Sequence, residues 1–271
     1  MDFYKYEAAG NDFILVDLSG GGNMADVDMW LEVLQEAAPR LCDRHFGIGA
    51  DGILVMAPSK RGVAYMHIIN ADGTLAAMCG NGIRCAARYI YRRRVFDTRE
   101  HLWIDTAGGL QAVSFLDDDG ACSLIDVKMA QAQVLDACHI QHENVRYDGI
   151  VVNTGNPHAV FEVENPAESL RISGNYLSNY PLFPDRANIE FISEFAPNVI
   201  DFAVYERGVG PTLSCGTGCV AAAVAYAQKR RILKGVVEIH APGGTLYVVL
   251  ENGEAHLQGP ATFVFSGQWE V

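Results

Sequence analysis

The sequence predicts an α+β fold of two similar, pseudo-symmetric domains, each with strands wrapped around a central helix. Three observations predict it. The chain repeats a series of motifs once, most apolar segments are short and bounded by turn residues, and two cysteine motifs each begin an alanine-rich segment typical of a helix. No glycine-rich nucleotide-binding loop follows a strand, which argues against a Rossmann sheet.

The repeat consists of three motif pairs in the same order. Gly10-Asn11 and Gly155-Asn156 each lead into an apolar segment, and segments 50–55 and 187–192 follow. The cysteine motifs come last, and two of the three pairs are offset by 136 or 137 residues. We expect one domain over 1–122, completed by 263–271, and another over 123–262. A two-fold relation would turn both helix starts toward an interdomain cleft, which becomes the expected active site.

The elements follow in chain order. An amphipathic helix is expected between Asp26 and Arg44, broken near Pro39. The helix after Cys79 has apolar residues at helical spacing, and the one after Cys215 is apolar on almost every side, as in a helix enclosed by strands. The remaining apolar segments are expected as strands, with a hairpin turn at 251–254; they include 102–104, 112–115, 236–239 and 245–250.

Composition limits the function classes. The chain is 49% hydrophobic with a net charge of −13, which argues against nucleic acid but not against a small substrate. No apolar run is long enough to span a membrane, and the N-terminus lacks signal-peptide features, so a cytoplasmic protein is expected. The spacing of the seven cysteines suits neither a zinc site nor a disulfide scaffold, so we expect reduced thiols and no metal.

Cys79 and Cys215 are the candidate catalytic groups. Each is followed by Gly-x-Gly at a helix start, where positive potential favours a thiolate and backbone N–H groups can hold a carboxylate. One thiolate and one thiol on opposite faces of a stereocentre would remove and return a proton, with inversion. A hydrolase would use only one of them, and a disulfide between them would be an inactive form. The remaining cysteines are expected in the core: Cys42, Cys85, Cys122, Cys138 and Cys219.

Further polar residues accompany the cysteines in the repeat. His158 lies in the loop that matches Gly10-Asn11, and Glu206 precedes Cys215 by the spacing that separates Asn70 from Cys79. Glu206 and Arg207 could bind a substrate ammonium and carboxylate, respectively. Alternatively, Glu206 and Arg207 form a surface salt bridge, and His158 has a structural role.

The chain resembles the diaminopimelate epimerase family, which needs no pyridoxal phosphate. The resemblance rests on motifs in order along nearly the whole chain: Gly10-Asn11-Asp12-Phe13, Asn70-Ala71-Asp72-Gly73, Cys79-Gly80-Asn81-Gly82, Gly155-Asn156-Pro157-His158, Arg186-Ala187-Asn188-Ile189, Tyr205-Glu206-Arg207-Gly208 and Cys215-Gly216-Thr217-Gly218. It implies epimerisation of LL-2,6-diaminopimelate to the meso form for lysine and cell-wall synthesis, without cofactor or metal, by a homodimer.

The resemblance also implies roles. Cys79 would be the base toward the LL substrate and Cys215 the proton donor, supported by His158 and Glu206. Backbone N–H groups at Gly80, Asn81, Gly216 and Thr217 would hold the reacting carboxylate. The rest of the substrate would be bound by Asn11, Asn70, Asn156, Asn188, Glu206 and Arg207.

Three positions depart from the family pattern. Gly52 stands where some members carry Gln, Pro211 where Glu is expected, and Tyr205 where Trp is frequent. The alternatives to diaminopimelate epimerisation are a racemase of another amino acid such as histidine, a phenazine-type isomerase relative, and a non-catalytic binding module. The phenazine-type relatives lack the cysteine pair. Asn70, Asn188 and Arg207 favour diaminopimelate over the other amino acids.

Overall fold

The computed structural model describes residues 1–20, 24–93, 101–116 and 124–270. The chain forms two compact units, one of Met1–Val127 with Gly259–Val271 and one of Lys128–Gln258. The domain boundary expected at 122/123 and the expected core residue Cys122 lie outside the described residues.

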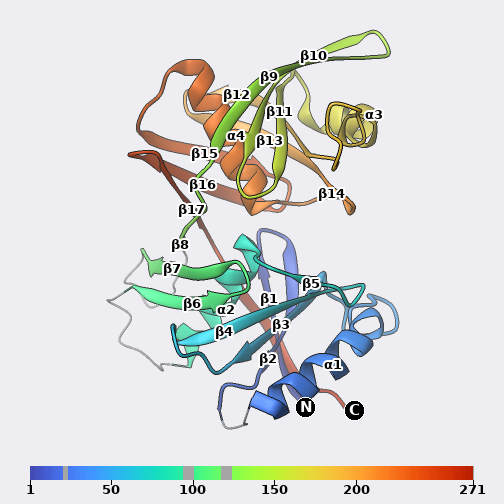
Figure 1. The fold of residues 1–271 in the computed structure, drawn as a ribbon, viewed down its shortest axis with the longest axis vertical. Helices are drawn as coiled ribbons and strands as arrows, with labels where there is room; N and C mark the ends of the chain where they lie inside the picture. Colours follow the sequence, from blue (N-terminus) through green and yellow to red (C-terminus); the bar gives the residue numbers. More distant parts are fainter. Residues whose placement is uncertain (21–23, 94–100, 117–123, 271) are drawn as a thin grey trace. The chain divides into compact units, whose positions relative to one another are not determined.

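The first unit has strands around one central helix, with a second helix outside. Its elements are β1 (Asp2–Ala8), β2 (Asn11–Asp17), α1 (Met24–Leu41), β3 (Gly52–Ala57), β4 (Ala64–Asn70), β5 (Leu75–Ala76), α2 (Gly80–Arg92), β6 (Leu102–Thr106), β7 (Gly109–Phe115), β8 (Ile125–Lys128), which ends at the unit boundary, and β18 (Thr262–Gln268). Strands β1, β2, β3, β4 and β6 all contact α2, as does β18 (Figure 1).

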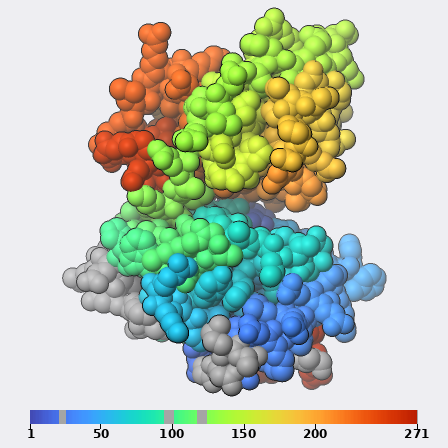
Figure 2. Space-filling view, in the orientation of Figure 1, coloured from blue at the N-terminus to red at the C-terminus, as the bar shows by residue number. Residues whose placement is uncertain are grey.

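The second unit repeats this plan. Its elements are β9 (Gln133–His142), β10 (Val145–Asn153), β11 (Pro157–Glu162), α3 (Pro166–Ser178), β12 (Asn188–Ala196), β13 (Val199–Glu206), β14 (Gly210–Thr212), α4 (Gly216–Arg230), β15 (Gly235–Ala241), β16 (Gly244–Glu251) and β17 (Glu254–Gly259). Here α4 is central, and α3 lies outside, where it is the gold surface beside the green strands in Figure 2.

Strand pairing shows that the repeat is structural. In the first unit β2 is antiparallel to β1 and parallel to β3, and β3 is antiparallel to β4. In the second, β11 is antiparallel to β10 and parallel to β12, and β12 is antiparallel to β13. In each unit a helix connects the two parallel strands, and the central helix follows a short hairpin strand.

The register makes individual residues equivalent. Phe13 pairs with Gly52 between β2 and β3, and His158 pairs with Asn188 between β11 and β12. Two residues further along β3 and β12 stand Leu54 and Glu190, respectively. The second unit therefore carries a histidine and a glutamate where the first carries a phenylalanine and a leucine.

The outer strand of the first unit is supplied by a distant part of the chain, whereas that of the second unit comes from a hairpin with its sequence neighbour. Strand β18 pairs with β1 of the first unit, and β9 pairs with β10 of the second. The two chain ends meet in the first unit, where Met1 and Trp269 exchange backbone hydrogen bonds of 2.6 and 2.9 Å (Figure 1).

Each outer helix encloses a separate apolar core against its sheet. Leu34 and Ala38 of α1 pack with Ile14 and Val55 in the first unit. Leu177 of α3 packs with aromatic residues of the second unit, among them Phe161, Phe191 and Tyr147. These cores fix the strands whose ends carry the candidate site residues.

Two helices differ from expectation. Helix α1 was expected to break near Pro39 but continues to Leu41, because Pro39 lies in its last turn and the Cys42 N–H still donates to the Ala38 carbonyl at 2.9 Å. Helix α3 was not expected at all. Its start carries clear local signals, since Pro166 follows the N-cap Asn165, whose side chain accepts from the Glu168 N–H at 3.1 Å.

Candidate active site

The two candidate cysteines are the N-caps of the two central helices. Cys79 caps α2 with φ −146° and ψ 118°, and Cys215 caps α4 with φ −130° and ψ 117°. Each sulfur accepts a hydrogen bond of 3.4 Å from the N–H three residues on, that of Gly82 or Gly218. The expected helix-start position of both thiols is confirmed.

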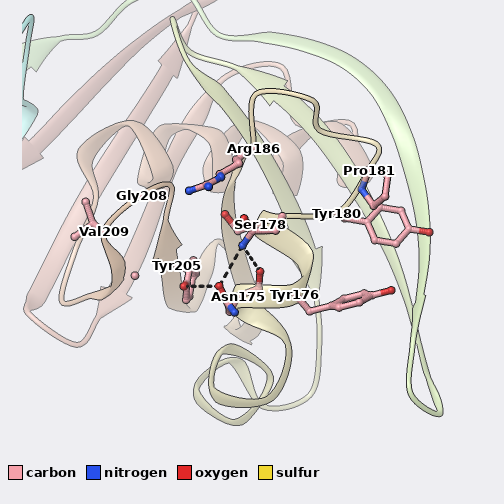
Figure 3. Close-up of a pocket in the computed structure, with 11 residues that line it drawn as sticks. Asn175, Tyr176, Ser178, Tyr180, Pro181, Arg186, Tyr205, Gly208 and Val209 are labelled. Carbon is pink, nitrogen blue, oxygen red and sulfur yellow. Dashed lines mark hydrogen bonds between the residues drawn. The ribbon is translucent and has the colours of Figure 1, made fainter.

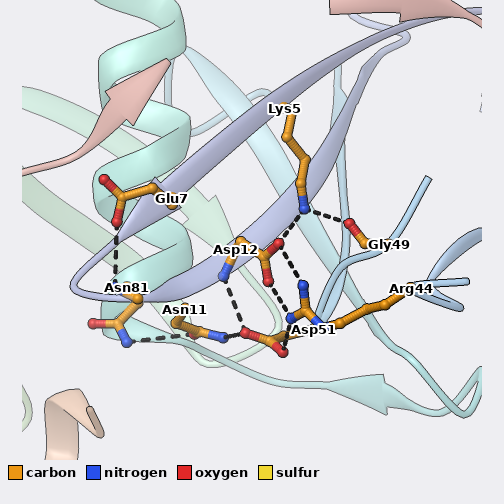
Figure 4. Close-up of polar contacts among 9 residues, drawn as sticks. Lys5, Glu7, Asn11, Asp12, Arg44, Gly49, Asp51 and Asn81 are labelled. Carbon is orange, nitrogen blue, oxygen red and sulfur yellow. Dashed lines mark hydrogen bonds and ion pairs between the residues drawn. The ribbon is translucent and has the colours of Figure 1, made fainter. Parts of the chain in front are cut away.

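Amide side chains surround Cys79 in the first unit. Its Sγ lies 3.7 Å from Asn11 Oδ1, to which Asn81 also donates at 3.3 Å. Asn11 in turn donates to Asp51 Oδ2 at 2.8 Å (Figure 4). Asn11 and Asn81, both expected in the site, are thus brought to the sulfur.

A charged network holds the loop that carries Asn11. Asp12 pairs with Lys5 and with Arg44, whose second partner is Asp51 at 2.8 Å (Figure 4). Lys5 also donates to the Gly49 carbonyl at 2.5 Å. This network ties the β1–β2 turn to the segment before β3 and so fixes Asn11.

Asn81 is oriented from the other side by Arg84. This arginine is wholly buried, and it donates to Asn81 Oδ1 at 2.8 Å and to the Gly80 carbonyl at 3.3 Å. A third bond of 3.2 Å reaches the Pro260 carbonyl. Arg84 therefore clamps the first turn of α2, where Gly80 and Asn81 lie.

Asn70 stands apart from this cluster. It is exposed at the end of β4, and its side chain donates to Thr74 Oγ1 at 2.9 Å. Its backbone faces Gly52 across the sheet.

Cys215 has a different environment in the second unit. Its sulfur lies 3.4 Å from Thr217 Oγ1, one of the expected substrate-binding residues, and Gly216 is buried beside it. Glu206, at the end of β13, accepts from Thr212 Oγ1 at 2.6 Å.

Cys215 is expected as the proton donor, and its environment favours the protonated form. Burial raises the pKa of Cys215 well above its usual value, and the Glu206 and Glu190 carboxylates add to this, against hydrogen bonds from Thr217 and Gly218. A helix terminus stabilises a charge by about 1 kcal/mol, whereas burying a charge costs several. Burial therefore outweighs the helix terminus and favours the thiol form of Cys215.

His158 lies within a buried polar pair that the sequence analysis did not foresee. His158 and Glu190 are both 0% exposed, and His158 Nδ1 lies 2.6 Å from Glu190 Oε1. His158 Nε2 lies 3.0 Å from Asn156 Oδ1, which also accepts from Thr154 Oγ1 at 3.0 Å. The expected site residues His158 and Asn156 are thus joined through hydrogen bonds.

Asn188 fixes the segment after β13. Its amide donates to the Pro157 carbonyl at 3.2 Å, and its Oδ1 accepts from the Arg207 N–H at 2.9 Å. The Arg207 side chain is exposed and donates to the Asp185 carbonyl at 3.2 Å. Asn188 therefore sets the backbone from which Arg207 and Glu206 project.

The three residues that depart from the family pattern lie in different structural settings. A Cβ added at Gly52 would lie 2.7 Å from the Ile69 carbonyl oxygen, so the sheet here admits only glycine. Pro211 is exposed on β14 and pairs with Tyr205. Tyr205 donates from its hydroxyl to Asn175 Oδ1 at 2.8 Å.

Tyr205 also lines a pocket of about 630 Å³ on the second unit (Figure 3). The pocket lies between the end of α3 and the turn after β13, and neither Cys215 nor the other expected site residues line it. Its lining residues are Asn175, Tyr176, Ser178, Asn179, Tyr180, Pro181, Arg186, Tyr205, Gly208, Val209 and Gly210.

The described residues were also compared with the requirements of a metal site, a membrane span and a disulfide. Within the described ranges, His, Cys, Asp and Glu side chains form no group of three that could hold a metal ion. No helix there combines the length and apolar character of a membrane span. The described cysteines are free thiols, and Cys42, Cys85, Cys138 and Cys219 are buried as expected.

Sequence reasoning missed Glu190, Asp51 and Arg84. Glu190 and Arg84 carried a usable signal. Glu190 is the one charge within the apolar run Asn188-Ile189-Glu190-Phe191-Ile192, and Arg84 is a charge inside the apolar helix face after Cys79. A lone charge in a buried element requires a partner.

The comparisons with known proteins identify the family. A model described as diaminopimelate epimerase matches residues 3–135 and 150–264. The chain belongs to the diaminopimelate epimerase family. Among curated members, that of Carboxydothermus hydrogenoformans is 36% identical over 99% of both chains. That of Halothermothrix orenii is 36% identical over 99% of this chain and 97% of its own. The resemblance drawn from the motifs is confirmed.

Solved structures show the same fold at low identity. A phenazine biosynthesis protein of the PhzF family from Bacillus anthracis superposes with a TM-score of 0.77 at 15% identity, over 100% of this chain and 99% of that one. A probable proline racemase from Agrobacterium radiobacter K84, with bound carbonate, gives 0.74 at 17%, over 100% and 93%. The expected α+β fold of two similar domains is confirmed.

Proposed function

We propose that this protein epimerises LL-2,6-diaminopimelate to meso-diaminopimelate, a step in lysine and peptidoglycan precursor synthesis. The observation that carries the proposal is the equivalent placement of Cys79 and Cys215 as N-caps of the two central helices. Membership of the diaminopimelate epimerase family supports the substrate.

In this proposal the two sulfurs exchange protons with opposite faces of one α-carbon. With the LL substrate, Cys79 as thiolate removes the proton and Cys215 as thiol returns one, so the carbon inverts. The raised pKa of Cys215 supports its part as donor, with burial as the main cause. The reaction leaves Cys79 protonated and Cys215 deprotonated, which is the state that runs the reverse direction.

The substrate carboxylate at the reacting centre would be held by helix N–H groups. Those of Gly80, Asn81, Gly216 and Thr217 lie in first turns, where the positive end of the helix dipole favours an anion. They would also stabilise the negative charge that develops on loss of the α-proton, without a cofactor. We assign the remaining contacts to Asn11, Asn70, Asn156, Asn188, Glu206 and Arg207, with His158 supporting Cys215 through Glu190.

Isotope exchange tests the reaction. Incubation with LL-diaminopimelate in deuterated water should place deuterium at one α-carbon as the meso isomer appears, measured by NMR and mass spectrometry. Absence of exchange, with the thiols confirmed as reduced, would contradict the proposal. Exchange into L-histidine but not into diaminopimelate would instead identify a racemase of another amino acid.

Substitution of either cysteine tests the two-base mechanism. Cys79→Ser and Cys215→Ser should each lower kcat for epimerisation by at least about 100-fold, because a serine hydroxyl is a far weaker acid than a thiol. Cys138→Ala, buried on β9, is the matched control and should keep its rate. Full activity in either serine variant would reject the mechanism, and a binding module would retain its ligand in both.

We also propose a cytoplasmic location, because the chemistry needs two reduced thiols, and reducing compartments preserve them. A homodimer is proposed from the family resemblance, and sedimentation of the purified protein tests it.

A further inference from the structure

We propose that the buried pair of Glu190 and His158 makes Cys215 the proton donor of the two cysteines, with Glu190 as a positioning residue of the site. The inference rests on the proposed epimerase function. The two N-cap thiols are equivalent in the repeat, but the strand side chains beneath them differ.

The first observation is the contrast between the units. Leu54 and Glu190 occupy equivalent places on β3 and β12, and Phe13 and His158 on β2 and β11. The fold itself therefore accepts an apolar pair under a central helix. A buried charged pair is generally no more stable than apolar residues of similar size, so stability does not account for Glu190 and His158.

The second observation places the carboxyl beside the thiol. A Cβ added at Gly218 would lie 2.8 Å from Glu190 Oε1 and 3.4 Å from Cys215 Sγ. The carboxyl oxygen and the sulfur therefore flank the same point at the start of α4. At Gly82 the same added atom would meet Leu54 Cδ2 at 3.2 Å and Cys79 Cβ at 3.4 Å.

The third observation concerns the proton between Glu190 and His158. Asn156 Oδ1 can only accept, so His158 Nε2 carries a hydrogen, and one further proton lies between His158 Nδ1 and Glu190 Oε1. Burial raises the pKa of Glu190, and the hydrogen bond and charge of His158 act against that rise, so His158 favours the carboxylate form of Glu190. Glu190 Oε2 is buried and has no hydrogen-bond partner among the described residues.

The charges that face Cys215 come from three strands. Glu190 stands on β12, Glu206 at the end of β13, and His158 on β11 behind Glu190, while the first turn of α4 has no charged residue. A negative charge beside a thiol disfavours the thiolate. The Glu190 carboxylate therefore adds to the rise in the pKa of Cys215 that burial causes, and His158 holds Glu190 in place through their hydrogen bond of 2.6 Å.

Glu190→Gln removes the charge and keeps the shape. For LL substrate, where Cys215 is the acid, the alkaline limb of kcat/KM should move about one pH unit lower, because Cys215 then loses its proton more readily. For meso substrate, where Cys215 is the base, the acidic limb should move lower by the same amount. Leu54→Met, the volume-matched change in the first unit, should move neither limb.

A second variant separates charge from packing. His158→Phe with Glu190→Leu copies the first unit, so it should fold with an unchanged or higher Tm and still show the lowered limbs. Glu190→Asp restores the charge and should return the limbs toward wild type. If the pH profile of kcat/KM does not shift in Glu190→Gln and only the rate falls, the inference is overturned and Glu190 has only a structural role.

A measurement without substrate keeps this test apart from that of the function. The pH dependence of Cys215 alkylation by iodoacetamide, followed by mass spectrometry, should shift lower in Glu190→Gln by the same amount. Wild-type protein that exchanges no deuterium would refute the epimerase function. Active wild-type protein with an unshifted Glu190→Gln alkylation profile would refute only the role of Glu190.

Discussion

Asp12 is the residue through which two cations stabilise the first unit. It accepts hydrogen bonds from Arg44 at 2.7 and 3.1 Å and pairs with Lys5. Burial would raise the pKa of Asp12, but the bonds from Arg44 and Lys5 outweigh it and lower the pKa to about 2. Because the folded state has the lower pKa, the carboxylate stabilises the fold fully above about pH 4, and this contribution is lost as the pH falls through about 2.

Asp12→Asn should reduce the free energy of unfolding by about 2 kcal/mol at pH 7. Urea unfolding followed by circular dichroism measures it, and the difference from wild type should shrink when the pH is lowered to about 2. The matched control is Asp28→Asn, an exposed aspartate on α1, which should change the midpoint much less. Equal effects of the two substitutions would mean that the ion pairs contribute nothing.

Residue roles were predictable where chemistry is local in the chain. The cysteine caps and the neighbouring Asn81 and Thr217 follow from short motifs, and the structure places all of them at helix starts. Glu190 was not predictable in the same way, because its partner His158 is 32 residues away and becomes a neighbour only through the pairing of β11 with β12.

At the scale of elements, the two central helices begin alike and pack differently. Gly82 and Gly218 each occupy the third helical position, and each closely approaches a strand side chain. At Gly82 that side chain is Leu54, which can rotate. At Gly218 it is Glu190, held by its bond of 2.6 Å to His158.

Gly218→Ala should therefore cost about 1–3 kcal/mol of stability through overpacking. Gly82→Ala should be close to neutral, since the strain on Leu54 is offset by the better helix propensity of alanine, about 1 kcal/mol. Thermal unfolding of the two variants side by side measures the contrast. A Gly82 variant as unstable as the Gly218 variant would show that the backbone, and not Glu190, makes the helix start tight.

Element prediction succeeded where the signal is a turn or a periodic run. The expected turn at 251–254 is a hairpin in which Asn252 and Gly253 have φ of 53° and 79°, the left-handed conformations that this residue pair accepts. The prediction of a break at Pro39 was wrong. A proline in the last turn of a helix removes only one backbone hydrogen bond, so α1 continues to Leu41. Element prediction also failed at α3, whose weak apolar periodicity concealed good capping residues.

At the scale of the whole molecule, the first unit is closed by the last strand of the chain. β18 pairs with β1 over Asp2 to Glu7, and its aromatic residues pack on the unit. Phe263 contacts the Tyr6 ring at 5.4 Å and lies under Arg92 at 3.9 Å. This return of the chain to the first domain was expected from the sequence, and the pairing shows what it supports.

A chain that ends at Gly259 should lose the stability of the first unit. Each lost strand bond is worth about 1 kcal/mol, and the edge of β1 becomes unpaired. Hydrogen exchange followed by mass spectrometry should show faster exchange in β1 and α2, with α4 and β12 still protected. A chain that ends at Gln268 keeps β18 and is the control. Unchanged protection of β1 in the shorter chain would show that β18 is dispensable.

The position of β18 also orders events during synthesis. The second unit is continuous in the chain, whereas β1 leaves the ribosome before it and must wait for β18, which follows the second unit. The hydrogen bond between Met1 and Trp269 spans 268 residues. Domains usually fold from the N-terminus as they emerge. Here the second unit can be completed first, and the unit that carries Cys79 is the last to close.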